Sequence, residues 1–228
     1  MNSQDVIQPE LDANSPIIYG YPHNCFTIAV MQCLIALNMK PKLREVLYGN
    51  REQIITLTSG NSYYVPVLQY LQDIVWENIA FYIDEKMGNN RLLPSDKAGL
   101  QTIVVQFLTQ QCHELVEMLT IGSLLDDMDD LVEKVMVIRH KERKYGEHCV
   151  ERWRESNAEL YQQFQDLILP FEQMLSYTPF LLGEEPVYAD FLFYGVMVNL
   201  TYNNYFPFPD SYRNIQKWCT AISDFRYE

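Results

Sequence analysis

Hydrophobic positions change their spacing along this chain of 228 residues, and the change divides it in two. Up to about residue 87, short apolar runs rich in β-branched residues flank one longer apolar run, a pattern typical of strands alternating with a helix. After residue 96, apolar positions recur every three or four residues over long stretches, as amphipathic helices require. The pattern therefore predicts an α/β segment followed by an all-α segment.

The first segment predicts four strands and two long helices. A strand–helix–strand start favours a parallel pair, and the last two strands favour an antiparallel hairpin. Because proline cannot donate to a sheet ladder, Pro66 must lie at an edge or a bend, and we expect a cis Val65–Pro66 peptide bond. The expected strands are Ser15–Tyr21, Lys42–Leu47, Tyr63–Tyr70 and Asp73–Trp76, and the expected helices are Phe26–Leu37 and Asn78–Met87.

The second segment predicts helices only. It follows residues 88–96, whose glycine, asparagines and proline are typical of a linker. The chain begins with residues 1–14, a polar stretch that we expect to be a flexible leader. The expected helices are Lys97–Thr120, Leu131–Lys144, Glu147–Tyr177, Val187–Thr201 and Ser211–Ser223.

Composition narrows the classes of function. The formal net charge is −13, so the surface repels phosphate backbones and we expect no nucleic-acid partner. The five cysteines are scattered and form no CxxC pair, which predicts reduced thiols, no metal site and a cytoplasmic protein. The polar, acidic start is unlike a signal peptide, and no apolar run of about 18 residues predicts a membrane span.

Four stretches carry motifs that are informative together. They are IIYGYPHNCFTIAVMQCLIAL (Ile17–Leu37), YVPVL (Tyr64–Leu68), VWENIAFYIDEKM (Val75–Met87) and PFLLGEEPVYADFLFYG (Pro179–Gly195). In this order they resemble the glutathione transferase superfamily over nearly the whole chain. The resemblance implies an α/β thioredoxin-like N-terminal domain at residues 15–87, a linker at 88–96 and an all-α C-terminal helical domain at 97–228.

The resemblance also implies ligands and partners. Glutathione, the cosubstrate, would lie against the first domain, and a small hydrophobic electrophile would lie against the helices. The family usually forms homodimers, uses no metal and serves in detoxification. In serine-type and zeta-like members, a Ser or Cys at the start of the first helix activates the glutathione thiol.

Asn24 occupies that Ser or Cys position, and Cys25 follows it. Unpaired N–H groups and the helix dipole favour an anion at a helix start, so a thiolate would be stabilised there. Asn24 can donate an amide N–H to a thiolate, whereas Cys25 could also form a mixed disulfide. Asn24 as a helix cap and Cys25 as a packing residue stay open. Tyr19 is a third candidate, since other classes carry a catalytic Tyr on this strand.

The resemblance assigns glutathione binding to two pairs of residues. Val65 and Pro66 form the cis-proline corner, where the backbone of the preceding residue pairs with the cysteinyl part of glutathione. Glu77 and Asn78 match the Glu-Ser pair that binds the γ-glutamyl end, with Asn in place of Ser. Weaker candidates for the glycine end are Arg51, Gln53 and Tyr64.

The leading hypothesis is therefore a transferase that conjugates glutathione to small apolar electrophiles. The first alternative is a noncatalytic glutathione-binding or structural relative, because Asn replaces the usual residue at positions 24 and 78. The second is a glutathione-linked thiol reductase or isomerase that uses Cys25. Among the charged stretches, Arg139–Lys144 is expected to pair with nearby carboxylates.

Overall fold

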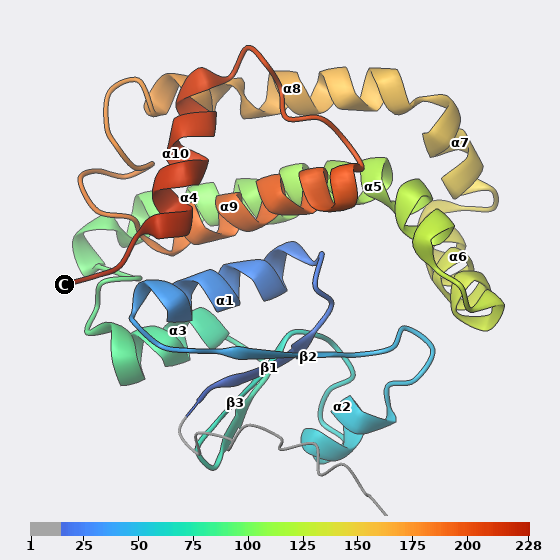
Figure 1. The fold of residues 1–228 in the computed structure, drawn as a ribbon, viewed down its shortest axis with the longest axis horizontal. Helices are drawn as coiled ribbons and strands as arrows, with labels where there is room; N and C mark the ends of the chain where they lie inside the picture. The colour runs from blue at the N-terminus through green and yellow to red at the C-terminus, as the bar shows by residue number, and fades with distance from the viewer. Residues whose placement is uncertain (1–14) are drawn as a thin grey trace, which may run out of the picture.

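The computed structural model describes residues 15–228, and the predicted leader at residues 1–14 lies outside the described residues. The described chain begins with a small sheet and continues as a stack of helices above it (Figure 1). This arrangement confirms the predicted fold class, a thioredoxin-like α/β part followed by an all-helical part.

The sheet has four strands in the order β2-β1-β3-β4. Strands β1 and β2 are parallel, and β3 is antiparallel to both β1 and β4, as predicted. The Val65–Pro66 peptide bond is cis, also as predicted. Strand β3 begins at residue 67, four residues later than expected, because Pro66 has no N–H to give to the ladder. The strands are β1 Ile17–Gly20, β2 Lys42–Glu45, β3 Val67–Tyr70 and β4 Asp73–Val75.

Three helices accompany the sheet. Helix α1 is apolar nearly all round because it lies between the sheet and the helical part (Figure 1). Helix α3 runs directly into a π-helical turn, Asp84–Gly88. These helices are α1 Cys25–Ala36, α2 Glu52–Leu57 and α3 Ile79–Ile83.

The helical part follows the predicted order with two differences. The run predicted at 97–120 continues to residue 127 through a π-helical turn, Leu108–Cys112, and the run predicted at 147–177 is broken at Ser156. Short 3-10 turns lie at Ser95–Lys97 and Tyr202–Asn204. The helices are α4 Ala98–Phe107, α5 His113–Asp127, α6 Leu131–Tyr145, α7 Cys149–Glu155, α8 Asn157–Met174, α9 Tyr188–Thr201 and α10 Arg213–Asp224.

None of the helices within residues 15–228 has both the length and the apolar character needed to cross a membrane.

Helix α9 is the centre of the molecule. It packs along α1 on one side and against α4, α5 and α10 on others (Figure 1). Asp190, fully buried in its first turn, accepts hydrogen bonds from the Leu181 and Val187 N–H groups and from the Trp218 indole, at 2.8, 3.0 and 3.0 Å. Burial raises the pKa of this carboxyl group to about 6, and the three donors oppose that shift. Asp190 therefore has the structural role that its sequence position indicates.

Gly195 sets how closely α9 approaches α1. A Cβ atom at this position would lie 2.2 Å from the Cys25 carbonyl oxygen and 3.3 Å from the Ala29 nitrogen. Both atoms belong to the backbone, so no side chain can turn aside to make room. Only glycine permits this approach, and the first turn of α1 is thereby pressed against the middle of α9.

We expect Gly195→Ala to lower the free energy of unfolding by about 1–3 kcal/mol, because the added methyl group must push two helices apart. Urea unfolding followed by circular dichroism measures the change. Gly99→Ala in α4 is the matched control, since a Cβ there meets nothing within 4 Å. That control should be neutral or stabilising by up to about 1 kcal/mol. Equal stability of the two variants would contradict the packing argument.

Candidate functional site

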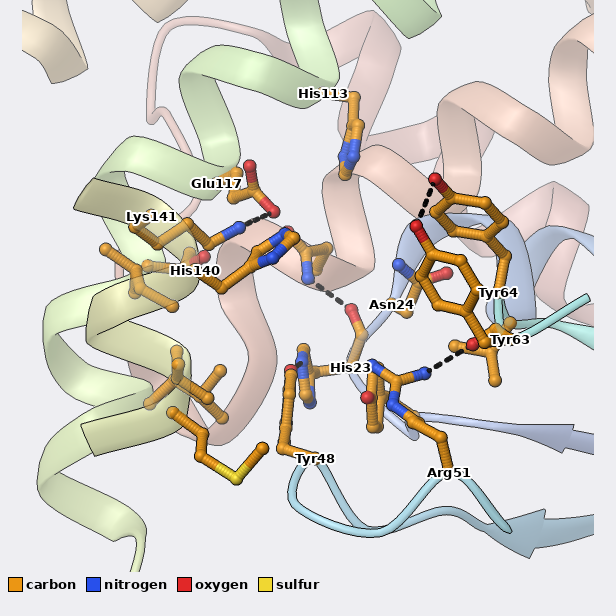
Figure 2. Close-up of a pocket in the computed structure, with 18 of the residues that line it drawn as sticks. His23, Asn24, Tyr48, Arg51, Tyr63, Tyr64, His113, Glu117, His140 and Lys141 are labelled. Carbon is orange, nitrogen blue, oxygen red and sulfur yellow. Dashed lines mark hydrogen bonds and ion pairs between the residues drawn. The ribbon is translucent and has the colours of Figure 1, made fainter. Parts of the chain in front are cut away.

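A cavity of about 330 Å³ lies between the sheet-bearing part and the helices α5 and α6. One wall consists of the β1–α1 loop and of segments 48–51 and 63–65. The facing wall consists of α5 and α6 (Figure 2), and Asn199 of α9 also lines the cavity. We refer to this space as the cavity.

Asn24 stands at the start of α1 and uses its two amide atoms differently. Its Oδ1 accepts hydrogen bonds from the Phe26 and Thr27 N–H groups, both at 3.1 Å, so it caps the helix. Its Nδ2 makes no hydrogen bond with any residue in 15–228 and faces the cavity (Figure 2). Capping and donation into the cavity are therefore compatible at this residue, because they use opposite ends of one amide.

Cys25, the next residue, faces the protein interior. It is fully buried, and its Sγ lies 3.2 Å from Nδ1 of His113. Burial raises the pKa of the thiol, and the charge of Glu117 adds to this effect. A buried, protonated thiol is a poor nucleophile. The geometry therefore favours the packing role for Cys25.

Tyr19 points to the other face of the sheet. It is 4% exposed and packs in a small cluster with Val46, Ile54 and Val67 on the side of α2. Its hydroxyl donates to Gln69 at 2.9 Å. Tyr19 does not line the cavity, and this position favours core packing.

Three of the four predicted glutathione-binding residues line the cavity or a neighbouring groove. Val65 lines both spaces, while Pro66 and Asn78 line the groove, which has a volume of about 890 Å³. Asn78 has a left-handed backbone, with φ at 51°, a conformation that asparagine tolerates well. Glu77, next to it, is exposed to solvent and lines neither space. Asn24 and Val65 thus line the cavity together, and Val65 and Asn78 line the groove together.

Two of the three weaker candidates also reach the cavity. Arg51 donates to the Tyr63 carbonyl at 3.2 Å, and its guanidinium lies 5.1 Å from the centre of the Tyr21 ring. Tyr64 lines both the cavity and the groove. Gln53 is exposed and lines neither space.

Sequence reasoning missed the facing wall of the cavity. Glu117 of α5 and Lys141 of α6 form an ion pair there, and Lys141 is only 8% exposed (Figure 2). The run Arg139–Lys144 was expected to pair with carboxylates, and this is confirmed for Lys141 and for Lys144, which pairs with Glu114. That one of these pairs borders a cavity depends on α5 and α6 lying side by side. A basic run alone does not reveal it.

Burial lowers the pKa of each of the three histidines that line the cavity, which favours the neutral imidazole. Burial, aided by the charge of Lys141, lowers the pKa of His23 to about 4, and its Nε2 lies 2.7 Å from the Tyr48 hydroxyl. Burial also lowers the pKa of His113. Burial would raise the pKa of Glu117, but the charge and hydrogen bond of Lys141 outweigh it, so the pKa is lowered. The cavity therefore contains a maintained ion pair and neutral imidazoles.

The loop that carries Asn24 is fixed from the helical side. Asn199 of α9 donates its Nδ2 hydrogen to the His23 carbonyl. One turn earlier, Gly195 admits the Cys25 carbonyl. Helix α9 thus positions the residues on both sides of Asn24.

Within residues 15–228, no three His, Cys, Asp or Glu side chains come together in a way that would hold a metal ion.

Comparison with known families finds one match. Residues 129–225 match the family described as Glutathione S-transferase, C-terminal domain. A comparison with curated protein sequences finds no match.

Solved structures resemble the chain over almost its whole length. A glutathione S-transferase of Ceriporiopsis subvermispora, solved in complex with glutathione, has a TM-score of 0.75 at 15% identity, covering 93% of this chain and 96% of its own. A glutathione transferase of Phanerochaete chrysosporium has a TM-score of 0.77 at 13% identity, covering 94% and 98%. Glutaredoxin 2 of Salmonella typhimurium, also with glutathione, has a TM-score of 0.71 at 17% identity, covering 92% and 94%.

Proposed function

We propose that this chain belongs to the glutathione transferase superfamily, binds glutathione at the edge of its sheet and conjugates it to small electrophiles in the cavity. The family membership rests on the matched C-terminal domain and on the shared fold. The activity is proposed from the site.

The observation that carries the proposal is the orientation of Asn24. Its Nδ2 faces the cavity at the positive end of α1, next to Val65 and the cis-proline. A thiolate placed there would receive a hydrogen bond from Nδ2 and a favourable interaction with the helix dipole. Both effects favour the anionic form of a thiol, which is the reactive form.

Beyond stabilising the thiolate, the protein would need to contribute little to the reaction. The bound thiol loses its proton to solvent, and the thiolate sulfur forms a bond to an electrophilic carbon. In a substitution the leaving group departs with the electron pair of the broken bond, and in an addition the product carbanion takes up a proton. Stabilising the thiolate lowers the pKa of the bound thiol and raises the fraction that can react near neutral pH.

Glutathione would lie along the edge from Asn24 to Asn78. The Val65 backbone would pair with the cysteinyl unit, Glu77 and Asn78 would hold the γ-glutamyl end, and Arg51 would hold the glycine carboxylate. The continuity of the cavity and the groove through Val65 supports this placement.

The electrophile would occupy the part of the cavity between the loop and the two facing helices. Apolar side chains contributed by α5 and α6 support an apolar body for this substrate: Ile121, Leu124, Met136 and Val137. Its reactive carbon would point toward Asn24, where the thiolate lies.

The thiol reductase alternative is disfavoured by the burial of Cys25, since disulfide exchange requires an accessible thiolate. The noncatalytic alternative differs from our proposal in the pKa of bound glutathione, which should then equal that of the free thiol.

A pair of substitutions at Asn24 tests the donor separately from the cap. Asn24→Asp keeps an oxygen that caps α1 but replaces the amide donor with a negative charge. We expect it to raise the pKa of the bound thiol by about one unit or more and to slow conjugation near pH 7 about tenfold. Asn24→Ser keeps an acceptor for the cap and a hydroxyl donor, so the pKa should stay low. The bound thiol is titrated by its thiolate absorbance.

Stability serves as the control for that pair. Aspartate and serine cap helices about as well as asparagine, so both variants should unfold within about 0.5 kcal/mol of the parent. If Asn24→Asp leaves the bound-thiol pKa unchanged, Asn24 is a cap alone and the proposed role is wrong.

Glu77→Ala should weaken glutathione binding by about 1–3 kcal/mol, because a charge-assisted hydrogen bond to the γ-glutamyl ammonium is lost. Calorimetric titration with glutathione measures the loss. Glu77 adjoins Trp76 and Asn78 of the groove, whereas Glu184 is an exposed carboxylate whose sequence neighbours line neither space. Glu184→Ala should therefore leave the affinity unchanged. If folded Glu77→Ala binds glutathione as tightly as the parent, Glu77 does not bind the γ-glutamyl end and this assignment is wrong.

A homodimer is also part of the proposal. Three apolar side chains on α3 and α4, Phe81, Leu100 and Ile103, are 61%, 62% and 66% exposed and would be covered by a second copy. Sedimentation equilibrium should give a dimer for the parent and a monomer for Ile103→Glu. The control Leu131→Glu on α6, where the parent residue is 74% exposed, should remain a dimer. A monomeric parent would refute this part.

A further inference from the structure

The lining of the cavity is charged differently from the rest of the protein. The chain has 30 acidic and 17 basic residues. The cavity is lined by three cationic side chains, Arg51, Lys141 and Arg143, and by a single carboxylate, Glu117. On a strongly acidic protein, the lining of this cavity thus has more cationic than anionic side chains, which indicates an anionic ligand.

The proposed binding of glutathione explains the positive charge on only one wall of the cavity. Arg51 belongs to the wall formed by the sheet-bearing part, where the glycine carboxylate of glutathione is proposed to bind. Lys141, which Figure 2 labels, and Arg143 both belong to α6, on the facing wall. The α6 cations are therefore left for the second substrate.

Helix α6 presents an ordered stripe to the cavity. Met136, His140 and Arg143 recur at helical spacing, and Val137 and Lys141 form the adjoining row. The stripe begins with apolar side chains and ends, one to two turns later, with polar and cationic ones. A ligand lying along it would place an apolar body near Met136 and a polar end near Arg143.

Lys141 has donors that the protein itself does not use. Its ammonium carries three N–H groups, and its only hydrogen bond with a residue in 15–228 is the one to Glu117. The residue is 8% exposed, so bulk water reaches the ammonium poorly. Because the Lys141–Glu117 pair is neutral overall, Arg143 supplies the net charge of this end. Lys144, by contrast, already contacts Glu114 and Tyr145.

We propose that the electrophile carries an anionic group, a carboxylate or its equivalent, which Lys141 and Arg143 bind on the wall of the cavity that faces the β1–α1 loop. The inference rests on the proposed function and adds the class of the second substrate. The apolar body of the electrophile lies against Met136 and Val137, and its anion fixes which carbon faces Asn24.

Product analogues test this without requiring turnover. Glutathione, S-benzylglutathione and S-(4-carboxybenzyl)glutathione are titrated calorimetrically into the full chain. The carboxybenzyl analogue should bind about tenfold more tightly than the benzyl analogue, because it gains a charge-assisted hydrogen bond. The preference should shrink as salt is added, since Arg143 is exposed.

Variants on α6 test whether Lys141 and Arg143 cause the preference for the carboxybenzyl analogue. Arg143→Gln and Lys141→Met should each reduce it severalfold, while affinity for glutathione stays unchanged. Arg139→Gln is the matched control, since it removes the same charge from the same helix outside the cavity and should keep the preference. If Lys141→Met leaves Glu117 unpaired and fails to fold, Arg143→Gln alone decides.

The outcomes separate this inference from the function it rests on. If glutathione binds but the two analogues bind equally, or the control loses as much preference as Arg143→Gln, the anionic class is wrong and the proposed function stands. If glutathione itself does not bind, both are wrong.

Discussion

The structure depends on the close approach of α9 to the first turn of α1. Gly195 leaves no Cβ where the Cys25 carbonyl lies, and Asn199, one turn on, donates to the His23 carbonyl. These two backbone contacts fix the loop on either side of Asn24. They also join the two parts of the chain at the point where the cavity opens. The geometry of the site is thus a consequence of helix packing between the parts, and not a property of the sheet alone.

That packing assigns opposite roles to two adjacent residues. The carbonyl of Cys25 lies against α9 and its thiol is buried near His113, while Asn24, one residue earlier, remains at the surface of the cavity. Asn24 satisfies two N–H groups of the helix with its oxygen, which leaves its nitrogen as a donor. The Asn24 amide therefore caps α1 with its oxygen and can donate to an anion in the cavity with its nitrogen. The buried thiol of Cys25 does not reach the cavity.

The sequence predicts the order of the elements well because their hydrophobic patterns differ: apolar positions are periodic in α10 and nearly continuous in the buried helices α1 and α9. It also predicts the cis Val65–Pro66 bond, since a proline in a strand allows few arrangements. It cannot predict the wall made by Glu117 and Lys141, which are 24 residues apart and meet only because α5 and α6 pack together. Nor can the sequence tell which of Asn24 and Cys25 faces the cavity. That orientation depends on the contact between the start of α1 and Gly195 of α9.

The central claim is that Asn24 directs its amide nitrogen at the sulfur of bound glutathione. A crystal structure of the chain with glutathione tests it directly. The account predicts a sulfur within about 3.5 Å of Asn24 Nδ2, with the Val65 backbone paired to the cysteinyl unit. A sulfur directed away from Asn24, or bonded to Cys25 as a mixed disulfide, would contradict it.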